Sequence, residues 1–67
     1  MEEQQWEYCL VHFTQSTLYL LTSEGPKKNK IQGGFDGCLA AIAQLGREGW
    51  EMTATPDYGV WFKRAVK

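Results

Sequence analysis

The sequence predicts an α+β domain with two layers and the order β-β-α-β-β, in which one helix packs on one face of an antiparallel sheet. Two observations indicate this class. Aromatic and β-branched residues, which favour strands, concentrate in four short segments. Between the second and third of these segments, apolar residues recur at spacings of three and four, as in an amphipathic helix. The 67 residues suffice for one small domain, 1–67.

Residues 6–13 and 17–23 are expected to form the first hairpin, joined by the short sequence TQS. Both segments have apolar residues at adjacent positions. Side chains alternate across a strand, so Tyr8 and Leu10 point to one face while Cys9, Val11 and Phe13 point to the other. The sheet therefore has two apolar faces, and one helix can cover only one of them.

Residues 24–34, EGPKKNKIQGG, combine Gly-Pro, lysines and Gly-Gly, and this composition predicts a mobile loop. The helix is expected to follow directly. Its apolar stripe consists of Phe35, Cys38, Leu39, Ile42 and Leu45.

The stretch LGREGW, residues 45–50, predicts the helix C-terminus. Gly49 is expected to adopt the left-handed conformation that commonly ends a helix. Gly46 is expected to let the end of the helix lie close to the sheet. Residues 50–55 and 58–66 are then the third and fourth strands, separated by a turn at Pro56.

Composition and charge exclude several classes of protein. The formal net charge of −1 provides no strong field toward nucleic acid or acidic membranes. No apolar run approaches the roughly 18 residues of a membrane helix. The acidic N-terminal residues do not resemble a signal peptide, so a cytoplasmic location is expected, with Cys9 and Cys38 as free thiols. The spacing of Cys and His fits no zinc site, and no cofactor is expected.

Three stretches resemble the small bacterial proteins grouped as domain of unknown function 4177. They are Trp6-Glu7-Tyr8, the junction Leu45-Gly46 with Gly49-Trp50-Glu51-Met52, and Phe62-Lys63-Arg64. Met52 stands where leucine is usual in that family. The resemblance spans almost the whole chain, although residues 24–34 have no counterpart. It implies a fold and carries over no activity and no catalytic residues.

Few residues suggest catalysis. His12 has no nucleophile or orienting acid specified by the sequence, and a surface or edge histidine is the simpler interpretation. Cys38 lies in the first turn of the predicted helix, where a thiol pKa can be lowered, but it also belongs to the apolar stripe. Glu7 and Glu51 could share the outward face if their strands pair, although exposed strand positions are commonly polar. We therefore expect no enzyme.

An apolar surface left uncovered by the helix predicts an interface. We expect a homo-oligomer, first a dimer, that packs sheet on sheet or edge on edge. The interface residues expected from the sequence are Cys9, Val11, Phe13, Tyr19, Leu21 and Trp61.

The function expected from the sequence is that of a small interaction or structural module. Two alternatives remain open. One is an oligomer that binds a small molecule, such as a nucleotide, between aromatic side chains at a subunit boundary. The other is weak nucleic-acid binding through a loop that contains Lys27, Lys28 and Lys30.

Overall fold

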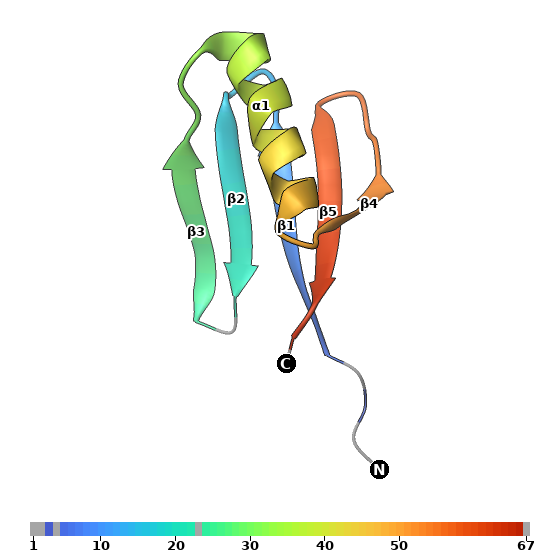
Figure 1. The fold of residues 1–67 in the computed structure, drawn as a ribbon. Helices are drawn as coiled ribbons and strands as arrows, with labels where there is room; N and C mark the ends of the chain where they lie inside the picture. The colour runs from blue at the N-terminus through green and yellow to red at the C-terminus, as the bar shows by residue number, and fades with distance from the viewer. Residues whose placement is uncertain (1–2, 4, 23, 67) are drawn as a thin grey trace.

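The computed structural model of the protein describes residues 3, 5–22 and 24–66. Its elements, in chain order, are β1 (Trp6–His12), β2 (Thr17–Thr22), β3 (Gly25–Lys30), α1 (Gly34–Arg47), β4 (Glu51–Ala54) and β5 (Gly59–Ala65). The five strands form one antiparallel sheet in the order β3-β2-β1-β5-β4. Helix α1 lies across one face of this sheet, in front of β1 (Figure 1). The predicted α+β class and the order of the predicted elements are confirmed.

Strand β3 is an addition to the predicted fold. Residues 25–30 pair with β2 along its whole length, so the loop expected for residues 24–34 is wrong over this range. Glycine, proline and lysine are poor formers of central strands. At a sheet edge, however, only one side of the strand needs backbone partners, and proline and lysine are common there.

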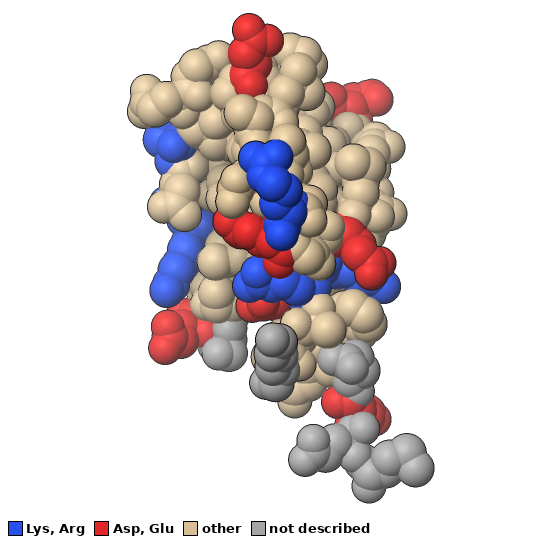
Figure 2. All heavy atoms as spheres, viewed as in Figure 1, with Lys and Arg blue, Asp and Glu red and all other residues tan. Residues whose placement is uncertain are grey.

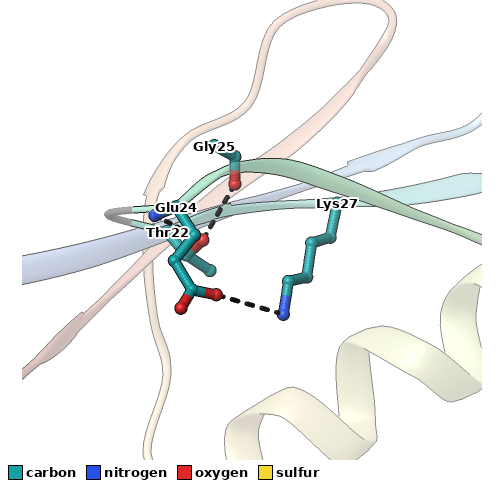
Figure 3. Close-up of polar contacts among 4 residues, drawn as sticks. All are labelled: Thr22, Glu24, Gly25 and Lys27. Carbon is teal, nitrogen blue, oxygen red and sulfur yellow. Dashed lines mark hydrogen bonds and ion pairs between the residues drawn. The ribbon is translucent and has the colours of Figure 1, made fainter.

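The turn between β2 and β3 explains why the chain folds back at this point. The hydroxyl of Thr22 donates to the carbonyl of Gly25 over 2.8 Å and accepts from the N–H of Glu24 over 3.2 Å (Figure 3). Gly25 has a φ of 113°, which glycine adopts without a Cβ clash. The exposed carboxylate of Glu24 also lies 3.9 Å from the Lys27 ammonium. Thr22 therefore provides turn chemistry that is not apparent from the glycine and lysine content of the segment.

The core lies between α1 and the face of the sheet that carries Cys9 and Val11. Both of these side chains are fully buried, as is Cys38 of α1. Other members of the cluster come from the helix end, the helix–strand turn and β5, namely Leu45, Trp50, Val60 and Phe62. The predicted apolar stripe is confirmed at Cys38 and Leu45, whereas Leu39 remains 46% exposed.

Helix α1 ends in a Schellman motif. The N–H of Trp50 donates to the carbonyl of Leu45 over 3.0 Å, and the N–H of Gly49 donates to the carbonyl of Gly46 over 3.2 Å. Gly49 has a φ of 91°, so its predicted left-handed role is confirmed. Leu45 and Trp50 both belong to the core cluster, which supplies the hydrophobic contact typical of this motif.

The role predicted for Gly46 is wrong. A Cβ added at this position would meet nothing within 4 Å, because the residue is exposed on the helix. The approach of the helix to the sheet therefore does not require a glycine there.

The two glycines provide a matched test of this helix end. We expect Gly46→Ala to raise the free energy of unfolding by about 0.5–1 kcal/mol, because alanine has the higher helix propensity and the site is open. We expect Gly49→Ala to lower it by about 1 kcal/mol or more, because alanine strains a positive φ. Urea unfolding followed by circular dichroism measures both values. Changes of the same sign would contradict this account.

Candidate interface on the open face of the sheet

We call the face of the sheet opposite α1 the open face. Its side chains alternate with the buried positions along each strand, and the strand register arranges them in three rows across the sheet. The first row consists of Glu51, Lys63, Tyr8, Leu21 and Pro26. The second row consists of Ala54, Trp61, Leu10, Tyr19 and Lys28. The third row consists of Gly59, His12, Thr17 and Lys30.

The structure divides the six predicted interface residues between the two faces. Tyr19, Leu21 and Trp61 lie together on the open face, as expected. The assignment of the remaining three to the uncovered face is wrong, because α1 covers that side. They are Cys9, Val11 and Phe13, the first two fully buried and the third packed against the core cluster.

The side chains of the two faces explain why α1 packs on the side of Cys9 and Val11. Cys9 and Val11 are small and have no strong polar group, so a helix can pack closely over them. Tyr8, Tyr19 and Trp61 are bulky, and each carries a polar group that needs a hydrogen-bond partner or water when buried. The helix therefore covers the face on which the central side chains are smaller and less polar. Apolar alternation in the sequence is equal for both faces and does not reveal this difference.

The open face contains apolar residues that the sequence analysis did not assign to the interface. Tyr8 is 43% exposed, Trp6 is 39% exposed, and the predicted residue Leu21 is 38% exposed. Leu10 is buried between its cross-strand neighbours Tyr19 and Trp61. The alternation of β1 would have identified these positions once the side covered by the helix was known.

An aromatic cluster extends along one end of the open face. The His12 ring stacks on Tyr58 at 5.2 Å between centroids and meets Tyr19 edge-on at 6.4 Å. The indole N–H of Trp61 donates to the Tyr58 hydroxyl over 3.2 Å. The Tyr19 hydroxyl in turn donates to the side-chain carbonyl of Gln15. These contacts hold the rings in place while Tyr58 remains exposed.

Lysines border the aromatic surface. The Lys28 ammonium lies 5.9 Å from the centre of the Tyr19 ring, and the Lys63 ammonium lies 4.2 Å from the centre of the Trp6 ring. Lys30 is in the third row, whereas Lys27 alternates to the helix side. On the helix side, acidic and basic side chains are interspersed (Figure 2). The lysine segment is therefore an edge strand with two of its lysines on the open face.

The remaining candidates for catalysis are not brought together. The Nδ1 atom of His12 contacts the Thr14 hydroxyl at 3.2 Å and accepts from the N–H of Gln15 over 3.3 Å, and neither partner is an acid. Glu51 lies opposite Lys63 on the open face, whereas Glu7 lies opposite Arg64 on the helix side. The two carboxylates do not share a face, because their partners Lys63 and Arg64 are successive residues of β5 and point to opposite sides of the sheet.

Arg64 joins three parts of the chain on the helix side. Its Nε donates to Oε1 of Glu7 over 2.8 Å, and its Nη2 forms an ion pair with the same oxygen at 2.7 Å. The guanidinium also lies 4.4 Å from the centre of the Trp50 ring and donates to the Glu48 carbonyl over 3.4 Å. This last contact places a cation at the negative end of the helix dipole.

A shallow cleft of about 480 Å³ adjoins this arginine. Its lining residues are Glu7, Glu48, Gly49, Arg64, Ala65 and Val66. The three stretches that carry the family resemblance supply Glu7, Trp50 and Arg64, and these residues meet here. The guanidinium already contacts Glu7, Trp50 and the Glu48 carbonyl. We therefore interpret this cluster as a structural contact that holds β1, the end of α1 and β5 together.

Both cysteines are free and buried in the core. Burial raises the pKa of the Cys9 thiol to about 11, and the positive charge of Arg64 opposes part of this increase. Cys9 is therefore a protonated core residue at neutral pH. Cys38 is the fifth residue of α1, just past the first turn, and its side chain belongs to the same apolar cluster, as the simpler interpretation of the sequence predicts.

Within residues 3, 5–22 and 24–66, no group of three or more His, Cys, Asp or Glu side chains is placed to hold a metal ion. Over the same residues, no helix has the length and apolar character needed to cross a membrane. Comparisons with protein-family models, with curated proteins and with solved structures found no match to this chain.

The raised pKa of the Cys9 thiol predicts that the protein loses stability at alkaline pH. Between pH 9 and pH 11 the unfolded chain ionises this thiol, from an ordinary pKa of 9.0, while the folded chain keeps it protonated. The contribution of Cys9 to the free energy of unfolding is therefore fully present below pH 9. It decreases as the pH rises to 11, by about 2–3 kcal/mol in total. Urea unfolding at several pH values measures the slope. Cys9→Ala should show a shallower decrease, and equal slopes for both proteins would contradict the assignment.

Proposed function

We propose that this protein is a small self-assembling module that pairs with a second copy of itself through the open face and has no catalytic activity of its own. One observation carries the proposal: the sheet is apolar on both faces, and the helix of the described chain covers only one. Several large apolar side chains exposed side by side commonly mark an interface. A domain of 67 residues also gains stability by oligomerising.

The sheet edges favour packing by the face. Strand β3 presents lysines and Pro26 along one edge, and these residues oppose pairing with another strand. At the other edge, β4 has four residues and a register shift between Met52 and Ala54, and Pro56 follows shortly after. Short, irregular edges also discourage sheet extension. Of the two modes expected from the sequence, sheet-on-sheet packing therefore has the better support.

A second copy suits the size and charge of the open face. Five strands spaced by about 4.8 Å, each about six residues long, give a face roughly 20 Å on each side. Such an area lies toward the small end of specific interfaces, so the expected dimer depends on protein concentration. The formal net charge of −1 also means that two copies repel one another little.

The proposal includes a cytoplasmic location and membership in the family of domain of unknown function 4177. The location is supported by Cys9 and Cys38, which are both free thiols, as is usual in a reducing compartment. The family is supported by the resemblance of three stretches of sequence, and by their convergence at Arg64.

A second candidate function is binding of single-stranded nucleic acid. It is supported by the position of Lys28 and Lys30 on the same face as Tyr19 and Trp61. Bases stack on aromatic rings, and lysines neutralise phosphates. The first candidate has the better support, because Glu51 also lies on this face and the chain is not basic overall.

Replacement of one exposed leucine on each side tests the assembly. We expect Leu21→Glu to abolish the dimer at micromolar concentration, because it places a charge within the apolar open face. Leu39→Glu is the matched control, since Leu39 is similarly exposed but lies on α1. Light scattering coupled to size-exclusion chromatography gives the mass of each protein. A wild-type protein that stays monomeric at millimolar concentration would reject the proposal.

The second candidate makes a separate prediction. If the open face binds nucleic acid, a fluorescent oligothymidylate should bind with an affinity that falls steeply between about 50 and 200 mM salt, because lysine–phosphate contacts release counterions. Fluorescence anisotropy measures this affinity, and Lys28→Glu should reduce it. The absence of binding at 50 mM salt would reject this candidate.

A further inference from the structure

We infer that the two copies pack about a two-fold axis parallel to the strands, which places Lys28 of each copy against the partner's Glu51. The inference rests on the proposed self-assembly through the open face, and it deepens that proposal by stating which edges meet. It follows from the strand order, from the row positions of the charged side chains and from the symmetry of a dimer.

The strand order limits how two open faces can meet. The sheet order β3-β2-β1-β5-β4 makes β1 the central strand. Aligned sheets pack face to face with their strands within about 30° of parallel or antiparallel. A two-fold axis parallel to the strands, passing over β1, places β3 of one copy over β4 of the other. An axis perpendicular to the strands, in the plane between the sheets, places β3 over β3 instead.

The charges on the open face distinguish these two arrangements. At the β3 edge, Lys28 lies in the second row and Lys30 in the third. At the β4 edge, Glu51 lies in the first row, opposite Lys63. With the parallel axis, equal rows of the two copies lie over one another, so Lys28 is one row from the partner's Glu51. One row is about 7 Å along the strand, a separation that a long lysine side chain can bridge.

The perpendicular axis brings like charges together. It places the β3 edges of both copies over one another with the row order reversed, so that Lys28 and Lys30 lie along the same edge as Lys28 and Lys30 of the second copy. Juxtaposed like charges weaken an interface. Glu51 would then lie at the opposite edge from Lys28 and Lys30 of the second copy. The parallel axis is therefore the arrangement favoured by electrostatics.

The centre of the open face fits the same axis. Leu10 of β1 is in the second row, and Trp61 and Tyr19 flank it on the neighbouring strands. An axis over β1 lets this apolar centre pack on its own copy, with the charged residues of β3 and β4 toward the rim. An apolar centre with a polar rim is the usual anatomy of a protein interface.

Charge reversal tests the axis. We expect Lys28→Glu and Glu51→Lys each to raise the Kd of the dimer about tenfold, because each substitution replaces two symmetry-related attractive contacts with repulsive ones. The double variant should restore the Kd to near the wild-type value. Lys27→Glu is the matched control, since Lys27 is on the same strand but faces the helix side. Sedimentation equilibrium measures each Kd.

Mixing the single variants shows that the contact is between copies. In a heterodimer of Lys28→Glu with Glu51→Lys, both contacts are attractive, so a ¹⁵N-labelled variant mixed with an unlabelled one should form mainly heterodimers by native mass spectrometry. With the perpendicular axis this mixture would also form heterodimers, so a second mixture, of Lys28→Glu with wild-type protein, distinguishes the axes. In that mixture the parallel axis predicts no preference for the heterodimer, because one contact is attractive and one is repulsive, whereas the perpendicular axis predicts mainly heterodimers, because opposite charges meet at the β3 edges. That result, or a Kd unaffected by the charge reversals, would overturn the axis while leaving the assembly intact.

Two other outcomes would overturn the inference in a different way. A wild-type protein that is monomeric at all concentrations would contradict the proposed self-assembly, and the proposed axis would then also be wrong. A monomer that binds oligothymidylate, and loses this binding in Lys28→Glu but not in Lys27→Glu, would assign the open face to single-stranded nucleic acid instead of a second copy. The mass and anisotropy measurements distinguish these outcomes.

Discussion

The packing of Cys38 and Leu45 of α1 on Cys9 and Val11 of β1 determines which face of the sheet is buried. Both faces carry apolar side chains, and one helix cannot cover two faces. The small side chains of β1 let the helix approach closely, whereas the tyrosines and Trp61 keep their polar groups accessible on the other side. The open face, and the proposed assembly, are consequences of this one contact.

Two local features keep the helix over the correct strands. The Schellman motif at Gly49 turns the chain and places Trp50 beneath the end of the helix. Arg64 then lies over the Trp50 ring and binds Glu7, so the first strand, the helix end and the last strand are joined at one point. Because Arg64 is partly exposed, its ion pair contributes modestly to stability. Its main effect is to fix the relative positions of these elements.

The edges of the sheet limit the ways in which the protein can associate. Strand β3 extends the sheet by one strand and at the same time protects its edge with lysines and Pro26. It also places Lys28 on the open face, next to Tyr19. One segment thus blocks association through the edge and supplies charge to the face. This combination makes the open face polar at its rim and apolar at its centre.

The sequence by itself determined the α+β class, the two predicted hairpins, the helix stripe at Cys38 and Leu45, and the glycine at position 49, because these depend on alternation, helical spacing and backbone freedom within short segments. It did not determine strand β3, because an edge strand needs only backbone partners and a turn closed by Thr22. It also did not determine which face of the sheet the helix covers, so Cys9, Val11 and Phe13 were assigned to the wrong face. Only the tertiary structure decided that point, because the two faces have equal apolar periodicity and differ in the size and polar groups of their side chains, which set how closely a helix can pack on each face.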